Sequence, residues 1–159
     1  MNKEAIKAYS VRVTQASQSE LTVILYEMIL SELEEAKMAY EKGDLDAFVK
    51  ELKRAQKYVT ELEATLNYNY TISYDLMSLY LYVNKRIITE IMQRNSAPLD
   101  SAQSVMKKLM IGFEGVSKTD KSGPVMRNTQ QLYAGLTYGK GHLNEVYVDP
   151  SNKSRGFIA

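Results

Sequence analysis

Residues 67–92 read NYNYTISYDLMSLYLYVNKRIITEIM, and the apolar pattern of this stretch decides the fold. From about Ile72 it predicts a helix, because apolar residues recur three or four positions apart along one face. That face carries Ile72, Leu76, Leu79, Val83 and Ile87. A second apolar stripe beside it contains Met77, Leu81, Ile88 and Met92, with Tyr80 and Tyr82 near it. A surface helix needs only one such stripe, so this helix requires several neighbours, one of which can come from outside the chain.

A first long helix is predicted before this stretch. Ser17 and Glu20 form a capping-box pattern at its start, and Gly43 ends it after about Lys42. Its inward positions are Leu21, Leu25, Met28, Leu33, Ala36 and Tyr40. Its outer side is acidic and is expected to face solvent, through Glu27, Glu32, Glu34, Glu35 and Glu41.

Two more helices complete the predicted domain. Asp44 caps the second, whose seam consists of Leu45, Phe48, Leu52, Ala55, Val59, Leu62 and Leu66. The third, from Ile72, ends near Arg94, before the turn sequence NSAP. Asp100 and Gln103 are expected to cap a fourth, with Ala102, Val105, Met106, Leu109, Phe113 and Val116 inward. We therefore predict an all-α, antiparallel, up-down-up-down four-helix bundle within residues 1–117.

The two ends of the chain are predicted to be less regular. Residues 1–16 read as a loose N-terminal segment that caps the bundle, anchored by a few apolar residues. Residues 118–159 read as a linker and a C-terminal extension that is either flexible or docked on the bundle. A short, glycine-weakened helix is predicted at 126–136. The tail residues expected to dock are Leu132, Tyr133, Leu136 and Tyr147.

Composition excludes several classes of protein. The 20 lysines and arginines nearly balance 19 aspartates and glutamates, which argues against a nucleic-acid binder. No run of eighteen apolar residues occurs, so no membrane insertion is expected. The N-terminus lacks the apolar core of a signal peptide, which favours a cytoplasmic protein. Cysteine is absent, so disulfides and cysteine-bound zinc are excluded.

Catalytic chemistry is scarce in this sequence. The single histidine is His142 in the tail, and no Glu-x-x-His pair, phosphate loop or nucleophile motif occurs. We expect no enzyme activity, no metal and no cofactor. One alternative is an anion pocket of the chorismate-mutase kind, but arginines on bundles usually lie at the surface. Its candidates are Arg12, Arg54, Arg86 and Arg94.

The bias toward tyrosine and methionine points to partner binding. The chain has 12 tyrosines and 8 methionines but no tryptophan. Tyrosine gives rigid contact area with an adaptable hydroxyl, and methionine adapts its shape to whatever packs on it. Five tyrosines crowd one end of the third helix, namely Tyr68, Tyr70, Tyr74, Tyr80 and Tyr82. Both core filling and a groove for a partner segment fit this cluster.

Several motifs together resemble the FliS-type flagellin export chaperones. AYSVRVTQAS at 8–17, EL at 20–21 and LYE at 25–27 are similar to the opening of that family. RA at 54–55, EL at 61–62, LN at 66–67 and LMSLYLY at 76–82 are similar to its second half. The resemblance covers residues 1–116. It departs from the family where Asn69, Tyr70 and Thr71 replace a usual glycine pair, and in the long tail.

This resemblance implies a helical bundle whose N-terminal segment covers its own apolar groove. It implies binding of the disordered C-terminal region of flagellin, which folds as it wraps around the chaperone. Such a chaperone prevents premature polymerisation and delivers flagellin to the flagellar type III export apparatus, without catalysis. In that case the tail is expected to compete with flagellin for the bundle.

We predict eleven partner contacts from the apolar pattern and the resemblance together. They are Ile6, Tyr9, Val13, Leu21, Leu25, Tyr26, Tyr70, Met77, Tyr80, Leu81 and Tyr82. The first three are expected to cover the groove along 72–92 when it is empty. Two alternatives stay open: a non-enzymatic adaptor or signalling bundle that binds a folded partner, and a homodimer.

Overall fold

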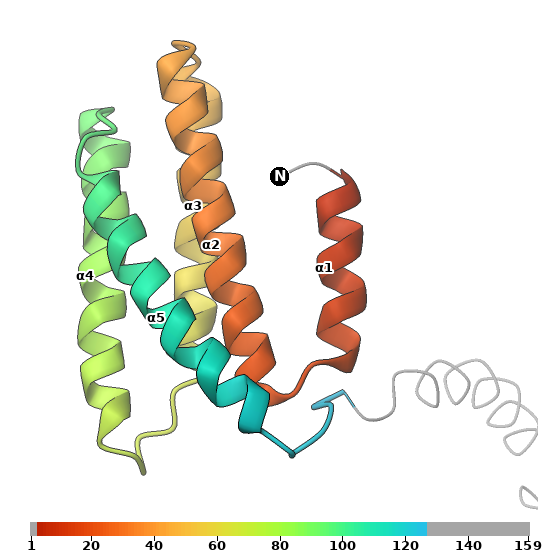
Figure 1. Cartoon of the computed structure of the whole chain (residues 1–159). Helices are drawn as coiled ribbons and strands as arrows, with labels where there is room; N and C mark the ends of the chain where they lie inside the picture. Colours follow the sequence, from red (N-terminus) through yellow and green to blue (C-terminus); the bar gives the residue numbers. More distant parts are fainter. Residues whose placement is uncertain (1–2, 127–159) are drawn as a thin grey trace, which may run out of the picture. The chain divides into compact units, whose positions relative to one another are not determined.

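The computed structural model describes residues 3–126, and this part of the chain is all-α (Figure 1). Its helices are α1 (Lys3–Gln15), α2 (Gln18–Glu41), α3 (Leu45–Ala64), α4 (Ile72–Gln93) and α5 (Leu99–Thr119). All five belong to one compact unit, Met1–Val125. No helix in residues 3–126 combines the length and the apolar character needed to cross a membrane. Of the predicted tail helix at 126–136, only Met126 is described, and it is not helical; the rest of that helix and the four tail residues expected to dock lie outside the described residues.

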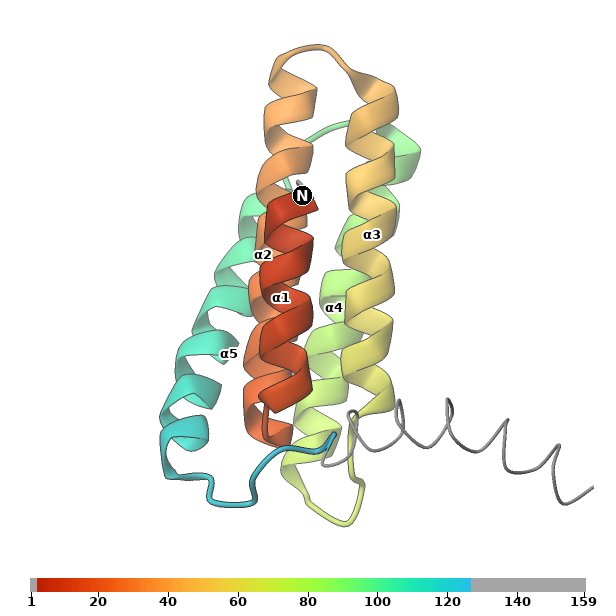
Figure 2. The ribbon, with the colours of Figure 1, turned by 90° about the vertical axis from the view of Figure 1, so that its right-hand side faces the viewer.

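Helices α2 to α5 form the predicted bundle, with successive helices antiparallel (Figures 1 and 2). Helix α2 packs against α3 and α5, and α4 packs against the same two helices. Helices α2 and α4 therefore lie on one diagonal of the bundle, and α3 and α5 on the other. This arrangement gives each helix two close neighbours and leaves one side of it outward.

The N-terminal segment is a helix, so the prediction of a loose lead-in was wrong. Residues Lys3–Gln15 form α1, which has Glu4 in its first turn and Arg12 in its last, as the helix dipole favours. The signal was in the sequence, because Ile6, Tyr9 and Val13 are spaced three and four apart. Helix α1 lies against α2, on the other side of the bundle from α4 (Figure 1). Helix α1 therefore does not cover the face of 72–92. The prediction that Ile6, Tyr9 and Val13 cover that face was wrong.

Most of the predicted helix ends are confirmed. The Glu20 amide donates to Ser17 Oγ at 3.3 Å, and the Ser17 amide donates to Glu20 Oε2 at 2.7 Å, which completes the capping box. Gly43 follows α2 with a φ of 74°, a conformation that glycine adopts without steric cost. The prediction for Asp100 was wrong, because α5 begins one residue earlier, at Leu99.

The inward face of α4 differs in part from the prediction. Leu76, Val83 and Ile87 are buried as expected, but Ile72 is 60% exposed and Leu79 is 37% exposed. Ile72 is the first residue of the helix, at the end of the bundle, where fewer side chains surround it. Tyr80, which we had placed beside the inward face, is instead almost fully buried.

Two tyrosines join the diagonal helices at the centre of the core. The hydroxyls of Tyr26 on α2 and Tyr80 on α4 are 2.5 Å apart, and neither ring reaches solvent appreciably. Burial raises the pKa of both hydroxyls, so both stay protonated and one donates to the other. The ring of Phe113 on α5 lies 5.6 Å from that of Tyr26. A polar contact therefore fixes how α2 and α4 face each other.

Replacing either tyrosine with phenylalanine tests this contact. Tyr26→Phe or Tyr80→Phe leaves the other hydroxyl buried without its partner, which we expect to lower the free energy of unfolding by about 1–3 kcal/mol. The double variant should lose less than the sum of the two. Urea denaturation measures all three values, and strictly additive losses would show that the hydroxyls do not interact.

Glu32 lies in the core rather than on the acidic outer side of α2, where we had predicted it. Its side chain is fully buried. Burial raises the pKa of Glu32 to about 7, and a hydrogen bond with Glu51 is the second-largest cause of this shift. Arg54 donates to Glu51 at 2.8 Å, and the pKa of Glu51 is lowered. Below about pH 7, Glu32 therefore holds its proton while Glu51 carries the charge.

This pair makes stability depend on pH. Since the folded pKa of Glu32 lies above its ordinary value of 4.5, the folded state holds the proton more tightly. Its stabilisation is full below about pH 4.5 and is lost as the pH rises through about 7. We expect Glu32→Gln to remove about 1–3 kcal/mol of this dependence between about pH 5.5 and 8. The exposed Glu41 on the same helix provides a control, Glu41→Gln. A wild-type stability that is flat across this range would contradict the assignment.

Candidate partner-binding surface

The outward side of α4 carries an apolar stripe, here called the outward stripe, which Lys85 interrupts between Leu81 and Ile88. It consists of Tyr74, Met77, Leu81, Ile88 and Met92. Met92 is 79% exposed and Leu81 is 53% exposed, whereas Met77 is half-buried. From first to last residue the stripe extends about 27 Å along the helix. The second apolar stripe predicted from the sequence therefore exists and faces away from the core.

A cavity lies at the end of the bundle where α4 begins, here called the foot cavity. Its volume is about 400 Å³. Its apolar walls are Leu66, Ile72, Leu76, Tyr80, Phe113 and Val116. Its polar lining includes Ser19, Thr22, Asn67, Ser73 and Asp120. The cavity thus combines an apolar interior with a few hydrogen-bonding groups, as binding sites commonly do.

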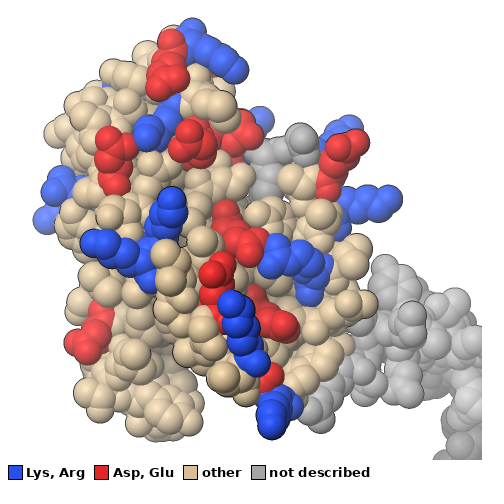
Figure 3. Space-filling model, viewed as in Figure 1, with Lys and Arg blue, Asp and Glu red and all other residues tan. Residues whose placement is uncertain are grey.

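The surface around the start of α4 carries few charges. Figure 3, seen from the same side as Figure 1, shows acidic and basic groups mixed over most of this face and few at the end where α4 begins. Tyr70 there is 65% exposed, and the rings of Tyr68 and Tyr74 lie 5.3 Å apart. The tyrosine cluster is therefore largely a surface feature, with Tyr80 as its buried member.

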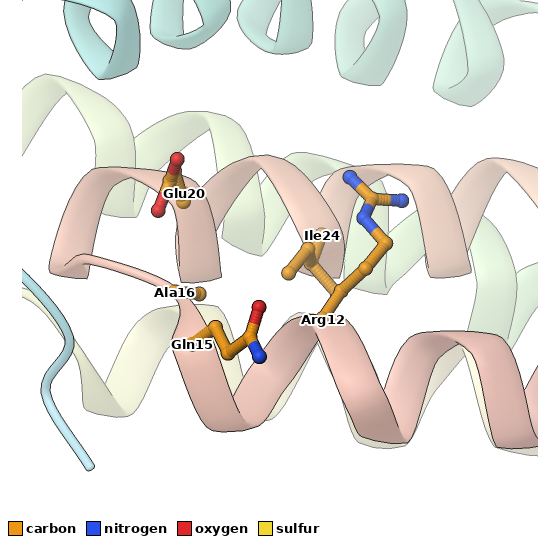
Figure 4. A pocket seen from close by; sticks show the side chains of 5 residues that line it. All are labelled: Arg12, Gln15, Ala16, Glu20 and Ile24. Carbon is orange, nitrogen blue, oxygen red and sulfur yellow. The ribbon is translucent and has the colours of Figure 1, made fainter. Parts of the chain in front are cut away.

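Polar contacts join helix α1 to α2. Arg12 donates to both carboxylate oxygens of Glu27, at 2.5 and 2.9 Å, and its guanidinium lies 5.7 Å from the ring centre of Tyr9. No residue of α1 is fully buried. Figure 4 shows Arg12 and Gln15 from α1 facing a pocket whose other side carries Ile24. Since no residue of α1 is fully buried, we expect α1 to detach more easily than the four helices of the bundle.

The joint between α1 and α2 is fastened to the end of α5. Ser19 donates a hydrogen bond to the carboxylate of Asp120, and the Val125 amide donates to the Ala16 carbonyl at 3.0 Å. Ser122 and Ser19 hold the pKa of Asp120 well below its usual range. Asp120 also lines the foot cavity. The carboxylate of Asp120 therefore links the wall of the foot cavity to the turn between α1 and α2.

Removing this carboxylate should loosen the joint without unfolding the bundle. In Asp120→Ala, Ser19 loses its acceptor, and we expect amide exchange at residues 16–19 and at Val125 to accelerate roughly fivefold to tenfold. Hydrogen–deuterium exchange measures this change, and Asp75→Ala on α4 serves as the exposed acidic control. Unchanged exchange at the joint would show that Asp120 does not fasten it.

The eleven predicted contact residues do not form one surface. Met77 and Leu81 lie on the outward stripe, and Tyr70 and Tyr80 line the foot cavity. Tyr82 turns toward α5, where its hydroxyl donates to Ser101 at 3.3 Å and Arg86 lies over its ring. The three α1 residues are at least partly exposed, namely Ile6, Tyr9 and Val13. Leu21 and Leu25 are half-buried on α2, whereas Tyr26 is fully buried and belongs to the core rather than to a surface.

Some cavity residues were not recognised from the sequence. The sequence predicts Phe113 and Val116 on the inner stripe of the fourth helix and indicates no site role for Ser19 or Asp120. The hydrogen bond between Ser19 and Asp120 spans 101 positions. A single sequence carries no signal for such a contact.

The fold and this surface define a small antiparallel helical bundle that exposes an apolar face along one helix. The chain belongs to the family described as flagellar protein FliS, whose model matches residues 1–120. It is 33% identical, over 76 residues, to the flagellar secretion chaperone FliS of Bacillus subtilis (strain 168). That match spans 48% of this chain and 57% of the relative.

A solved structure shares the fold. It is described as the crystal structure of a flagellar chaperone from bacteria, and it superposes with a TM-score of 0.62 at 19% sequence identity. The match covers 73% of this chain and 99% of that one. At this level of identity, the likeness supports the bundle architecture alone.

Proposed function

We propose that this chain is a flagellar export chaperone that binds the disordered C-terminal region of flagellin. Binding keeps flagellin from polymerising early, and the complex is delivered to the flagellar type III export apparatus in the cytoplasm. Membership of the FliS family and the description of the Bacillus relative as a secretion chaperone support this role. The observation that carries the proposal is the outward stripe of α4.

The shape of the stripe suits an amphipathic segment. At about 27 Å, it matches a partner helix of about five turns, whose apolar side chains recur with the same spacing. A folded partner is served better by a compact patch, which the narrow stripe does not provide. The stripe therefore favours a segment that is unfolded before it binds.

The energetics allow a segment to order on this surface. Fully burying a large apolar side chain contributes about 1.5–3 kcal/mol, and the most exposed members of the stripe are Tyr74, Leu81, Ile88 and Met92. Ordering a disordered segment costs about 2–5 kcal/mol or more. Burial of these four side chains, together with those of the client, is enough to exceed that cost.

The foot cavity gives the client an anchor beyond the stripe. Its volume of about 400 Å³ accommodates one or two large apolar side chains. Ile72 lines the cavity and lies two residues before Tyr74, the first member of the stripe. A segment that places an anchor in the cavity can thus continue along α4.

Helix α1 acts in this proposal as a detachable element on α2. When it leaves, it uncovers Ile24 and frees its own side chains Ile6, Tyr9 and Val13, which are then available to a partner. Deleting residues 1–16 should therefore change flagellin affinity. If isothermal titration calorimetry gives the same flagellin affinity with and without residues 1–16, α1 has no part in binding. The role proposed for α4 would not be affected by that result.

Polar substitutions on the stripe test the proposal directly. In Leu81→Ser/Ile88→Ser, two exposed apolar contacts are lost, and we expect affinity for the flagellin C-terminal region to fall about tenfold to a hundredfold. Ile111→Ser on α5 is the matched control, because Ile111 is 60% exposed but lies on another helix. Both proteins should keep wild-type thermal stability.

A pull-down separates the client segment from the rest of flagellin. Full-length flagellin should be captured, and flagellin without its C-terminal region should not. Equal capture of both forms would favour an adaptor that recognises a folded partner. Equal affinity of the Leu81→Ser/Ile88→Ser variant and the wild type would refute the role of α4.

A further inference from the structure

The outward face of α3 carries a compact row of cations. Lys50, Lys53, Arg54 and Lys57 fall within two turns of the helix, and the three lysines are exposed. Arg54 pairs with Glu51, but the lysines form no ion pair within residues 3–126. We call these four residues the basic row. The net charge of the whole chain is only +1, so its composition does not reveal this local concentration.

The spacing within the basic row is unfavourable for an isolated helix. Lys50 and Arg54 are four residues apart, as are Lys53 and Lys57. Like charges at this spacing repel and cost about 0.2–0.5 kcal/mol per pair. A negative partner lying along the row would remove this repulsion.

The row borders a shallow hollow that has an apolar component. The hollow has a volume of about 470 Å³ and is lined by Val49 and Asp46 together with the four cations. Figure 2 shows α3 at the edge of the bundle, while α1 lies over α2. The face is therefore accessible while α1 is in place.

We propose that the outward face of α3 docks an acidic polypeptide segment. The row is about 10 Å long and one helix wide, which suits a single chain with carboxylates three and four residues apart. Acidic residues bound it at both ends, Asp46 before it and Glu61 after it. These two charges limit the length of an anionic ligand and disfavour a broad anionic surface such as a membrane.

This site is separate from the proposed flagellin site. The basic row lies on α3, and the outward stripe lies on α4. The two sites also require different partner chemistry. Ion pairs dominate binding at the basic row, whereas burial of apolar side chains dominates binding at the outward stripe. An acidic segment and the apolar client can therefore occupy the bundle together, and the two proposals can fail independently.

A designed peptide provides the probe. It carries glutamates three and four residues apart on one helical face, with a leucine among them to contact Val49. A control peptide has the same composition with its glutamates spread around the helix. Fluorescence anisotropy with the full chain should show tighter binding of the first peptide, and binding should weaken strongly in about 0.5 M NaCl.

Charge reversal locates the binding face. Lys50→Glu/Lys53→Glu/Lys57→Glu should weaken binding about tenfold or more. The control Lys85→Glu/Lys107→Glu/Lys108→Glu changes three exposed lysines on α4 and α5 and should leave affinity within about twofold. If the reversed protein does not fold, the glutamine triple variant at 50, 53 and 57 replaces it, again with weaker binding expected.

Three results would overturn the proposal. The first is equal affinity for the two peptides, and the second is equal loss of binding in the reversal and control variants. The third is binding to phosphatidylglycerol vesicles that depends on the basic row when neither peptide binds, which would assign the face to a membrane. Unchanged flagellin affinity in the reversal variant is expected, since that site lies on α4.

Discussion

The structure depends on a mismatch between the apolar circumference of α4 and the cover that two neighbouring helices provide. In the bundle, α4 packs against α3 and α5 only along its inner side. Leu76, Tyr80, Val83 and Ile87 fill that side and are almost fully buried. The remaining apolar side chains stay outside because no further helix of the described chain reaches them. By contrast, the large apolar seam of α3 is buried almost completely, and its outward face is charged.

Polar groups inside the bundle fix its geometry. Apolar packing alone tolerates small rotations of a helix, whereas the hydroxyl contact between Tyr26 and Tyr80 holds α2 and α4 in one register. The buried carboxyl of Glu32 adds a second constraint between α2 and α3, through Glu51. A fixed register keeps the outward stripe turned away from the core. The core thus positions the surface that a partner would use.

Most of the fold could be predicted from the sequence because caps and periodicity are local signals. The capping box at Ser17, the turn at Gly43 and the seam of 45–66 each act over a few residues. The errors concern contacts between distant segments. The sequence around Glu32 does not indicate that its side chain contacts Glu51 on α3. The sequence around Asp120 likewise does not indicate its hydrogen bond with Ser19. For the candidate site, the second apolar stripe of 72–92 could be predicted from the sequence. The foot cavity could not, because it forms only where the ends of four helices pack together.

The most direct test of the central claim uses methionine methyl groups as reporters. Met77 and Met92 lie on the outward stripe, Met38 is exposed on α2, and Met106 is buried in the core. In methyl NMR spectra recorded during titration with the flagellin C-terminal segment, the account predicts that the Met77 and Met92 signals shift while that of Met38 stays in place. Bound spectra in which Met77 and Met92 are unchanged and Met38 shifts would contradict it.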